Sequence, residues 1–333
     1  MTTRAAGFDL GNGYTKAVSS TREAAFPSII APARELRFVA GDAWGDGGPG
    51  DICLHTASGR WFVGDLAQRQ SRFAVQEIGQ SRLADGYYRV LFEAALTEAL
   101  GRGCEVRAVC GLPIGWYTPE NRRRVTEMLQ GEHRLERDGK SVYAVSAVRV
   151  VPEPFGALLS LLLGQDGLIV HPDVAQQTVG VIDIGTKTTD FALFDRLEYI
   201  DHRSASIEAG LSDAQAALAQ HVQDRHGIEL SLREADQAMR DGYLRVYGDR
   251  VDLGAPIAQA LAQLAERIAA KAMALWDTGA AVDRLALAGG GAPPLSAALA
   301  VRLMHRHLAV VEHPFWANVR GFYRWGLRES TWG

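Results

Sequence analysis

The sequence has few cysteines and no strong charge bias. Only Cys53, Cys104 and Cys110 occur among 333 residues, and they form no CxxC pair. This pattern excludes a disulfide framework and is typical of a reducing compartment. The formal net charge of −4 gives no electrostatic basis for direct nucleic-acid binding. We therefore expect a cytoplasmic protein that does not itself contact nucleic acid.

Long apolar runs and several well-known motifs are also missing. The most apolar stretch, ALLSLLLG (157–164), is far too short to cross a bilayer, and the N-terminal residues lack the apolar core of a signal peptide. We therefore expect no membrane association. The absence of GxxxxGK[ST] excludes a P-loop, and no GxGxxG dinucleotide fingerprint follows a predicted strand.

Helix and strand patterns alternate along the whole chain, which predicts the α/β class. The length of 333 residues is about twice that of a usual domain, so one large lobe or two lobes are expected. The glycine-rich segment 41–50 is predicted to be a loop and a candidate for local disorder. The clearest predicted elements are strands around 179–184 and 190–194 and helices near 212–225, 231–240 and 255–278.

One short frame occurs twice. FDLGNGYTKAV and IDIGTKTTDFAL each place an aspartate, Asp9 or Asp183, before an apolar residue, a glycine, a polar turn and a second apolar strand. The two aspartates are 174 positions apart (183 minus 9), which is about half of the chain. The repeat indicates two related lobes that each contribute one turn to a shared cleft. Taken singly, either turn is equally well explained as an ordinary Asp-Gly hairpin.

The composition of the two turns suits an anion. Glycines at a strand reversal let backbone N–H groups converge on one point, and hydroxyl and ammonium groups add further donors for phosphate oxygens. The candidate phosphate-binding residues are Gly11, Asn12, Gly13, Tyr14 and Lys16 in the first turn, and Gly185, Thr186, Lys187, Thr188 and Thr189 in the second.

The two aspartates predict a metal ion. A carboxylate beside bound phosphates is repelled unless a divalent cation lies between them, and neither acid is expected to have a cationic partner in its own motif. Asp9 and Asp183 are therefore interpreted as ligands of Mg²⁺, through its water molecules, because Mg²⁺ keeps much of its hydration shell.

A third glycine cluster follows a predicted strand. LALAGGGAPPL places Gly289, Gly290 and Gly291 between that strand and a helix. Three consecutive glycines are costly to order, so another group is expected to approach the backbone closely there. An adenine ring or an α-phosphate at the helix start would fit, whereas a tight strand–helix turn needs only one glycine.

These three motifs, in this order, resemble the phosphate-1, phosphate-2 and adenosine motifs of the actin, sugar-kinase and heat-shock-chaperone ATPase superfamily. The chain is most similar to the bacterial and archaeal actin-like proteins of the ParM/StbA type, also through FPSIIAPA, WFVGDLA and GLPIGWY. The resemblance implies an actin-like (ribonuclease H-like) fold with two lobes and a central nucleotide cleft. It places the first lobe at 1–155, with 311–333 returning to it, and the second lobe at 175–310.

The resemblance also implies a catalytic residue. PEPFGALL resembles the first connecting segment of the family, which carries the residue that positions the hydrolytic water, and Glu153 falls there. Asp183 is the second expected catalytic residue. An acid at a helix start is the alternative interpretation of Glu153. Lys187 departs from the family, because many members have glycine at this position.

Three functions fit this resemblance. The first is an ATPase that polymerises into cytoskeletal filaments for plasmid segregation, with ATP or GTP and Mg²⁺ as cofactors. Its expected partners are further copies of itself and a DNA-binding adaptor protein. The alternatives are a small-molecule kinase of the same superfamily and a regulatory or chaperone ATPase that does not polymerise. The exposed loop 41–50 and the aromatic residues Trp316, Tyr323 and Trp325 are the first candidates for subunit contacts, the aromatics being equally suited to packing within a lobe.

Overall fold

The computed structural model describes residues 3–35, 51–71, 73–76, 80–83 and 86–332. The loop expected at 41–50 lies outside these residues. The chain forms two compact units, one made of Met1–Pro172 with Trp316–Gly333 and the other of Asp173–Phe315. Strands and helices alternate in both, so the predicted α/β class is confirmed.

The first unit is built on a mixed sheet, which the described residues form in the order β3-β2-β1-β7-β9-β8-β5-β6-β4. Its strands are β1 (Thr3–Leu10), β2 (Tyr14–Ser19), β3 (Glu23–Pro27), β4 (Ile30–Pro32), β5 (Ile52–Thr56), β6 (Gly59–Val63), β7 (Glu105–Leu112), β8 (Gly131–Glu136) and β9 (Lys140–Pro152). Its helices are α2 (Asp65–Gln70), α3 (Tyr87–Leu100), α4 (Pro119–Leu129), α5 (Glu153–Leu162), α10 (Ala317–Gly326) and the 3₁₀ turn η1 (Gln80–Leu83).

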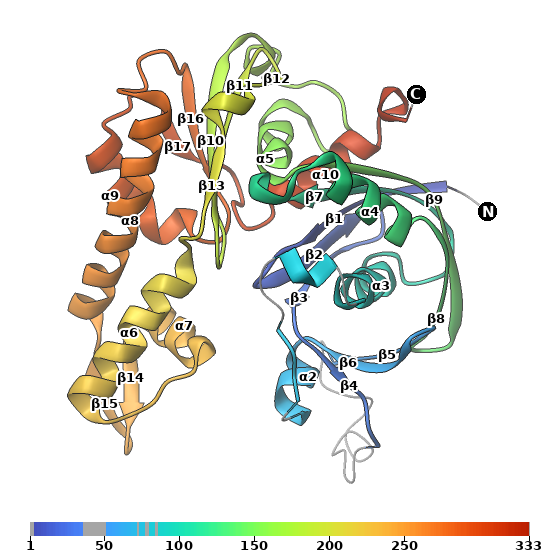
Figure 1. The fold of residues 1–333 in the computed structure, drawn as a ribbon, viewed down its shortest axis with the longest axis horizontal. Coiled ribbons are helices and arrows are strands. Elements are labelled where there is room, and N and C mark those ends of the chain that lie inside the picture. Colours follow the sequence, from blue (N-terminus) through green and yellow to red (C-terminus); the bar gives the residue numbers. More distant parts are fainter. Residues whose placement is uncertain (1–2, 36–50, 72, 77–79, 84–85, 333) are drawn as a thin grey trace. The chain divides into compact units, whose positions relative to one another are not determined.

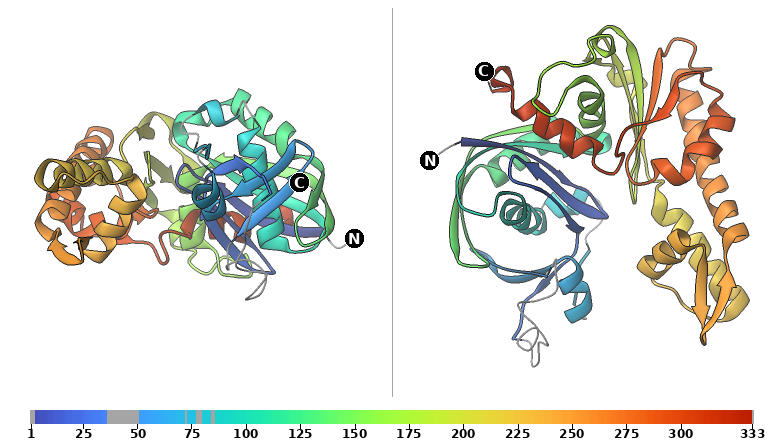
Figure 2. Two further views of the ribbon diagram at one scale, coloured as in Figure 1. Left: turned by 90° about the horizontal axis from the view of Figure 1, so that it is seen from below. Right: turned by 180° about the vertical axis from the view of Figure 1, so that it is seen from behind.

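Two helices cover opposite faces of this sheet at β1 (Figures 1 and 2). Neighbouring residues of a strand point to opposite faces. Phe8 packs against Phe92 of α3, with ring centroids 4.7 Å apart. Gly7 faces α10 so closely that a Cβ there would lie 2.4 Å from the carbonyl oxygen of Val319. The face of β1 that carries Gly7, which has no side chain, therefore packs against the C-terminal helix α10.

Helix α10 also crosses α5 in the first unit. A Cβ at Gly321 would lie 1.9 Å from the carbonyl oxygen of Gly156, so both positions of this crossing need glycine. Trp325 of α10 packs edge-on against Phe155 of α5, with ring centroids 5.5 Å apart. Of the two interpretations of Trp325, this contact supports packing within a unit.

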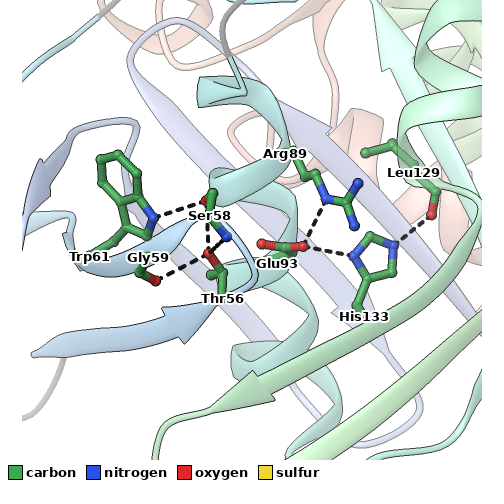
Figure 3. A network of polar contacts seen from close by, with 8 residues as sticks. All are labelled: Thr56, Ser58, Gly59, Trp61, Arg89, Glu93, Leu129 and His133. Atoms are coloured by element: carbon green, nitrogen blue, oxygen red, sulfur yellow. Dashed lines mark hydrogen bonds and ion pairs between the residues drawn. The ribbon is translucent and has the colours of Figure 1, made fainter.

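A buried polar network joins α3 to β8 (Figure 3). His133 is 1% exposed, and its Nδ1 lies 3.0 Å from Oε1 of Glu93, while its Nε2 lies 2.9 Å from the carbonyl oxygen of Leu129. Nε of Arg89 donates to the same Glu93 oxygen at 2.9 Å. Both ring nitrogens of His133 thus face oxygen atoms.

The second unit contains a smaller sheet, which the described residues form in the order β12-β11-β10-β16-β17, with β13 beside β11. Its strands are β10 (Thr178–Ile184), β11 (Thr189–Asp195), β12 (Glu198–Tyr199), β13 (Ala205–Ile207), β16 (Arg284–Ala288) and β17 (Leu308–Val310), and a separate hairpin consists of β14 (Tyr243–Val246) and β15 (Asp249–Asp252). Its helices are α6 (Leu211–His226), α7 (Leu232–Asp241), α8 (Gly254–Trp276) and α9 (Ala292–Leu303).

The predicted helices of this unit are confirmed to within two residues at each end. Helices α6 and α7 end at Gly227 and Gly242, which adopt the left-handed conformation that stops a helix at glycine. Ser231 and Glu234 form a capping box at the start of α7. Apolar residues of α6, α8 and α9 pack with the sheet in one core that includes Phe191 and Trp276.

Candidate functional site

The first turn joins β1 to β2 at the end of the sheet strands. Asp9 faces Lys16 and Leu10 faces Thr15 across the antiparallel pair, so the turn runs from Gly11 to Tyr14. Nζ of Lys16 lies 2.7 Å from Oδ2 of Asp9, and the two side chains are 11% and 4% exposed. The expectation that Asp9 has no cationic partner in its own motif is therefore wrong. Position 16 lies opposite position 9 because the turn has four residues.

The carbonyl groups of residues 10–13 are all held by donors from outside the turn. The donors are Nη2 of Arg82 to Leu10 O (2.9 Å), Oγ of Ser28 to Gly11 O (2.7 Å), Nε2 of Gln76 to Asn12 O (3.0 Å) and the N–H of Ser28 to Gly13 O (3.0 Å). In a trans peptide the N–H of the next residue points opposite to the carbonyl. Each N–H of the turn is therefore directed away from the donor that holds its peptide plane, as an anion-binding turn requires.

The second turn has the same register in the other unit. Asp183 faces Asp190 and Ile184 faces Thr189, so the turn runs from Gly185 to Thr188. Every paired position is 174 residues beyond its counterpart in the first turn, without an insertion. The paired strand positions differ in charge, because an acid (Asp190) stands where the first motif has Lys16.

The N-terminus of α6 holds the second turn. The N–H of Leu211 donates to the carbonyl of Gly185 at 3.1 Å, and that of Ser212 donates to the carbonyl of Thr186 at 2.8 Å. A Cβ at Gly210 would lie 2.5 Å from the Thr186 carbonyl oxygen, so glycine is needed for this approach. Both turns thus have their carbonyls fixed by neighbouring elements.

Thr189 does not act as sequence analysis expected. Its side chain is fully buried, and its hydroxyl donates to the carbonyl of Ala209 at 2.6 Å. A hydroxyl has one hydrogen to donate, so Thr189 has none left for a phosphate oxygen. The expectation that Thr189 is a phosphate donor is wrong, because this residue belongs to the strand and not to the turn. Thr186 and Thr188 precede the strand.

The three glycines after β16 have different surroundings. Gly289 has a φ of +81°, and a Cβ there would lie 2.3 Å from the Ile184 carbonyl oxygen and 2.5 Å from Oδ1 of Asp183. A Cβ at Gly291 would lie 2.3 Å from Cγ2 of Ile184, and the N–H of Gly291 donates to the same Ile184 carbonyl at 2.9 Å. Close contacts with Asp183 and Ile184 therefore explain two of the three glycines. Gly290 is exposed, and a Cβ there would meet its nearest atom, in Phe315, at 3.6 Å.

Glu153 is the first residue of α5 and is half-buried. A Cβ at Gly111 would lie 2.8 Å from Cγ of Glu153, so glycine at the end of β7 makes room for this side chain. Burial raises the pKa of Tyr88 well above its usual value, and the charges of Cys110, Arg82, Glu153 and Asp9 add smaller effects. Because Coulomb effects weaken with distance, the fold brings Asp9, Glu153 and Arg82 into the surroundings of Tyr88.

Two family models match most of the chain. The model of the N-terminal domain of actin-like proteins matches residues 7–156, and the model of the C-terminal domain of archaeal MreB-like actin homologues matches residues 181–301. The chain belongs to the actin-like proteins. Its three glycine motifs all fall inside these two matches.

Solved actin-like structures share the whole fold of this actin-like chain. A 15-stranded ParM filament from Clostridium botulinum has a TM-score of 0.81 at 21% identity, covering 98% of this chain and 99% of that one. An archaeal actin homologue in complex with ADP has a TM-score of 0.78 at 20% identity, with 96% and 97% covered. ParM of Bacillus thuringiensis with AMPPNP has a TM-score of 0.75 at 16% identity, with 99% and 100% covered. No curated protein matches the sequence.

The metal assignment of the actin-like chain was tested against its side chains. Among the described residues, no group of three or more His, Cys, Asp or Glu side chains could hold a metal ion by itself. This fits Mg²⁺, which takes one or two carboxylates and completes its shell with water and phosphate. Asp183, 6% exposed at the end of β10, fits that role, whereas Asp9 would share its carboxylate between the ion and Lys16.

Sequence reasoning missed the residues that support the first turn. Ser28 lies inside the apolar stretch FPSIIAPA, where a lone hydroxyl is a signal that could have been noticed. Arg82 and Gln76 carry no such signal, because only the tertiary fold brings them to the turn. Within the described part of the actin-like chain, no helix is both long and apolar enough to span a membrane.

Proposed function

We propose that this actin-like chain binds and hydrolyses ATP with Mg²⁺ and assembles into filaments that move or position DNA in plasmid segregation. The observation that carries the proposal is the repeated turn, which has the same register in both units at a constant offset of 174 residues. Support for assembly comes from the likeness to a ParM filament, and support for nucleotide binding comes from neighbours solved with ADP and AMPPNP.

The proposed roles follow the geometry of each turn. N–H groups of the first turn and the donors Lys16, Thr186, Lys187 and Thr188 bind phosphate oxygens. Asp183, assisted by Asp9, holds Mg²⁺ through water, and the ion neutralises phosphate charge. The stretch at Gly290 lies against the adenosine moiety. Parallel pelleting assays with ATP and with GTP distinguish the two nucleotides.

Glu153 is assigned to the hydrolytic step. A water oxygen forms a bond to the γ-phosphorus while the bond from that phosphorus to the bridging oxygen of ADP breaks. The carboxylate of Glu153 accepts the proton that the water loses. The products are ADP and inorganic phosphate. Loss of the γ-phosphate contacts weakens the subunit contacts, which couples nucleotide state to assembly.

The partners follow from assembly. A filament grows when one surface of a subunit binds a different surface of the next, so the first partner is a second copy of this chain. The net charge of −4 gives no basis for direct DNA binding, so a separate adaptor protein is proposed to join filament and DNA.

Light scattering and pelleting test this function. Protein with Mg²⁺ and ATP is expected to form pelletable polymers above a critical concentration, and ADP is expected to raise that concentration. Asp183→Asn should abolish Mg²⁺-dependent hydrolysis, while Asp195→Asn should not, because Asp195 lies at the opposite, exposed end of the same strand pair. A chain that stays monomeric with ATP and GTP and phosphorylates an added small molecule would instead be a kinase.

A further inference from the structure

We propose that Arg82 is a positioning residue of the first turn and that its guanidinium sets the affinity of the chain for nucleotide phosphates. The inference rests on the proposed function, because it assigns phosphate binding to this turn. Arg82 lies in η1, outside the three glycine motifs and outside both strands of the turn.

The guanidinium of Arg82 holds two points of the turn at once. Nη2 donates to the carbonyl of Leu10 at 2.9 Å, and Nη1 donates to Oδ1 of Asn12 at 3.1 Å. These acceptors flank Gly11, a residue whose backbone is free to adopt many conformations. The planar fork of an arginine fits two acceptors in a fixed relation, which a lysine cannot do. Arg82 therefore fixes the Leu10–Gly11 peptide plane on one side of Gly11 and the Asn12 side chain on the other.

The charge of Arg82 has no carboxylate partner among the described residues. The side chain is 1% exposed, it donates to neutral oxygen atoms, and its Nε has no hydrogen-bond partner in the described part of the chain. The rings of Tyr87 and Tyr88 lie 5.4 and 5.7 Å from the guanidinium carbon. A buried cation is costly unless an opposite charge compensates for it. Phosphate groups on the turn would supply that compensation.

The two acids near Arg82, Asp9 and Glu153, already have other assigned partners or roles. Asp9 pairs with Lys16 at 2.7 Å. Glu153 begins α5 and is the residue assigned to the hydrolytic water. Lys16 and Asp9 compensate each other, so Arg82 adds a positive charge beside the turn. The phosphates would therefore be held by a turn that Arg82 both shapes and makes more positive.

The test compares a ligand with phosphates to one without them. Affinities for ATP and for adenosine are measured by calorimetry on wild type, Arg82→Lys and Arg82→Met. Both variants are expected to lose about tenfold or more in ATP affinity, the effect of one hydrogen bond to a charged group. Adenosine affinity should stay unchanged. Arg82→Lys keeps the charge but should not rescue binding, because the fork is lost.

Arg324→Lys is the matched control. Nη1 of Arg324 also binds two backbone oxygens of the same unit, those of Ser160 and Leu163 at 2.9 Å each, and these acceptors lie in α5 and at its C-terminal end. This variant should bind ATP like wild type. If Arg82→Met fails to fold, the two single variants Arg82→Lys and Ser28→Ala are compared instead. Ser28→Ala removes the hydrogen bond from the Ser28 hydroxyl to the Gly11 carbonyl.

Two results would overturn the assignment of Arg82. One is unchanged ATP affinity in Arg82→Lys and Arg82→Met. The other is an equal loss of ATP and adenosine affinity, which would show only a general role in folding. Wild-type protein that binds neither ligand would instead refute the proposed function, and this outcome is visible before any variant is made.

Discussion

Nζ of Lys16 lies 2.7 Å from Oδ2 of Asp9 across β1 and β2, and this buried pair has no counterpart at the equivalent position of the second turn. There Asp183 faces Asp190. The two turns therefore share a backbone but not a charge distribution. We expect Asp183 to contribute more to cation binding than Asp9, whose charge Lys16 already neutralises.

The first prediction concerns this ion pair. Asp9→Ala removes the carboxylate that faces Lys16, so the free energy of unfolding should fall by about 1–3 kcal/mol, the range for losing a hydrogen-bond partner of a charged group. Adding Lys16→Met should restore most of that stability without restoring hydrolysis. Urea denaturation of both variants measures the effect. Wild-type stability in Asp9→Ala would show that the pair contributes nothing.

The second prediction concerns Glu153. Glu153→Ala should still bind ATP and polymerise, but hydrolysis should slow by about 10²–10⁴-fold, as expected when a general base is lost. Filaments should persist after ATP addition, as followed by light scattering and phosphate release. Glu120→Ala is the control, because Glu120 is also an acid in the first turn of a helix of the same unit. Similar, small effects of both variants would leave Glu153 as a helix-terminal acid only.

The third prediction separates two neighbouring glycines. Gly289→Ala places a Cβ 2.3 Å from the Ile184 carbonyl oxygen at a φ of +81°, so the unit should lose about 1–3 kcal/mol or more. Gly290→Ala has room for the methyl group and should keep its thermal midpoint. If Gly290 lies against the nucleotide, Gly290→Ala should nevertheless weaken ATP binding. A Gly290→Ala protein with unchanged affinity would contradict the adenosine assignment.

The fourth prediction concerns the network between α3 and β8 (Figure 3). Glu93→Gln removes the carboxylate that His133 and Arg89 contact, so stability should fall by about 1–3 kcal/mol. The double variant Glu93→Leu with His133→Phe should be more stable than Glu93→Gln, because the buried carboxylate and the buried imidazole are removed together. Thermal unfolding compares the variants. The opposite order of stability would show that the network is not an ion pair.

The parts of the fold that depend on local pattern could be predicted from the sequence. Helix ends at Gly227 and Gly242, and the cap of α4 by Thr118, follow from the conformations these residue types favour. The repeated turns were also predicted, since glycine and polar residues between apolar strands indicate a strand reversal. These signals lie within a few residues of one another.

What could not be predicted depends on the register and on distant segments. Lys16 lies opposite Asp9 only if the turn has four residues, and the sequence alone does not determine the length of the turn. Thr189 and the turn threonines look alike in sequence, yet the strand register buries only Thr189. Arg82 reaches the turn from 70 positions beyond Asn12, a contact that no local pattern indicates.

The glycine contacts of α10 affect the order in which this chain can fold during synthesis. Gly7 of β1 packs on the backbone of Val319, so the first unit needs residues from both ends of the chain. The second unit, Asp173–Phe315, is continuous and is synthesised before α10. Domains generally fold as units as they emerge. The face of β1 at Gly7 thus stays uncovered until α10 has been synthesised and has docked, a period in which a chaperone has access to the nascent chain.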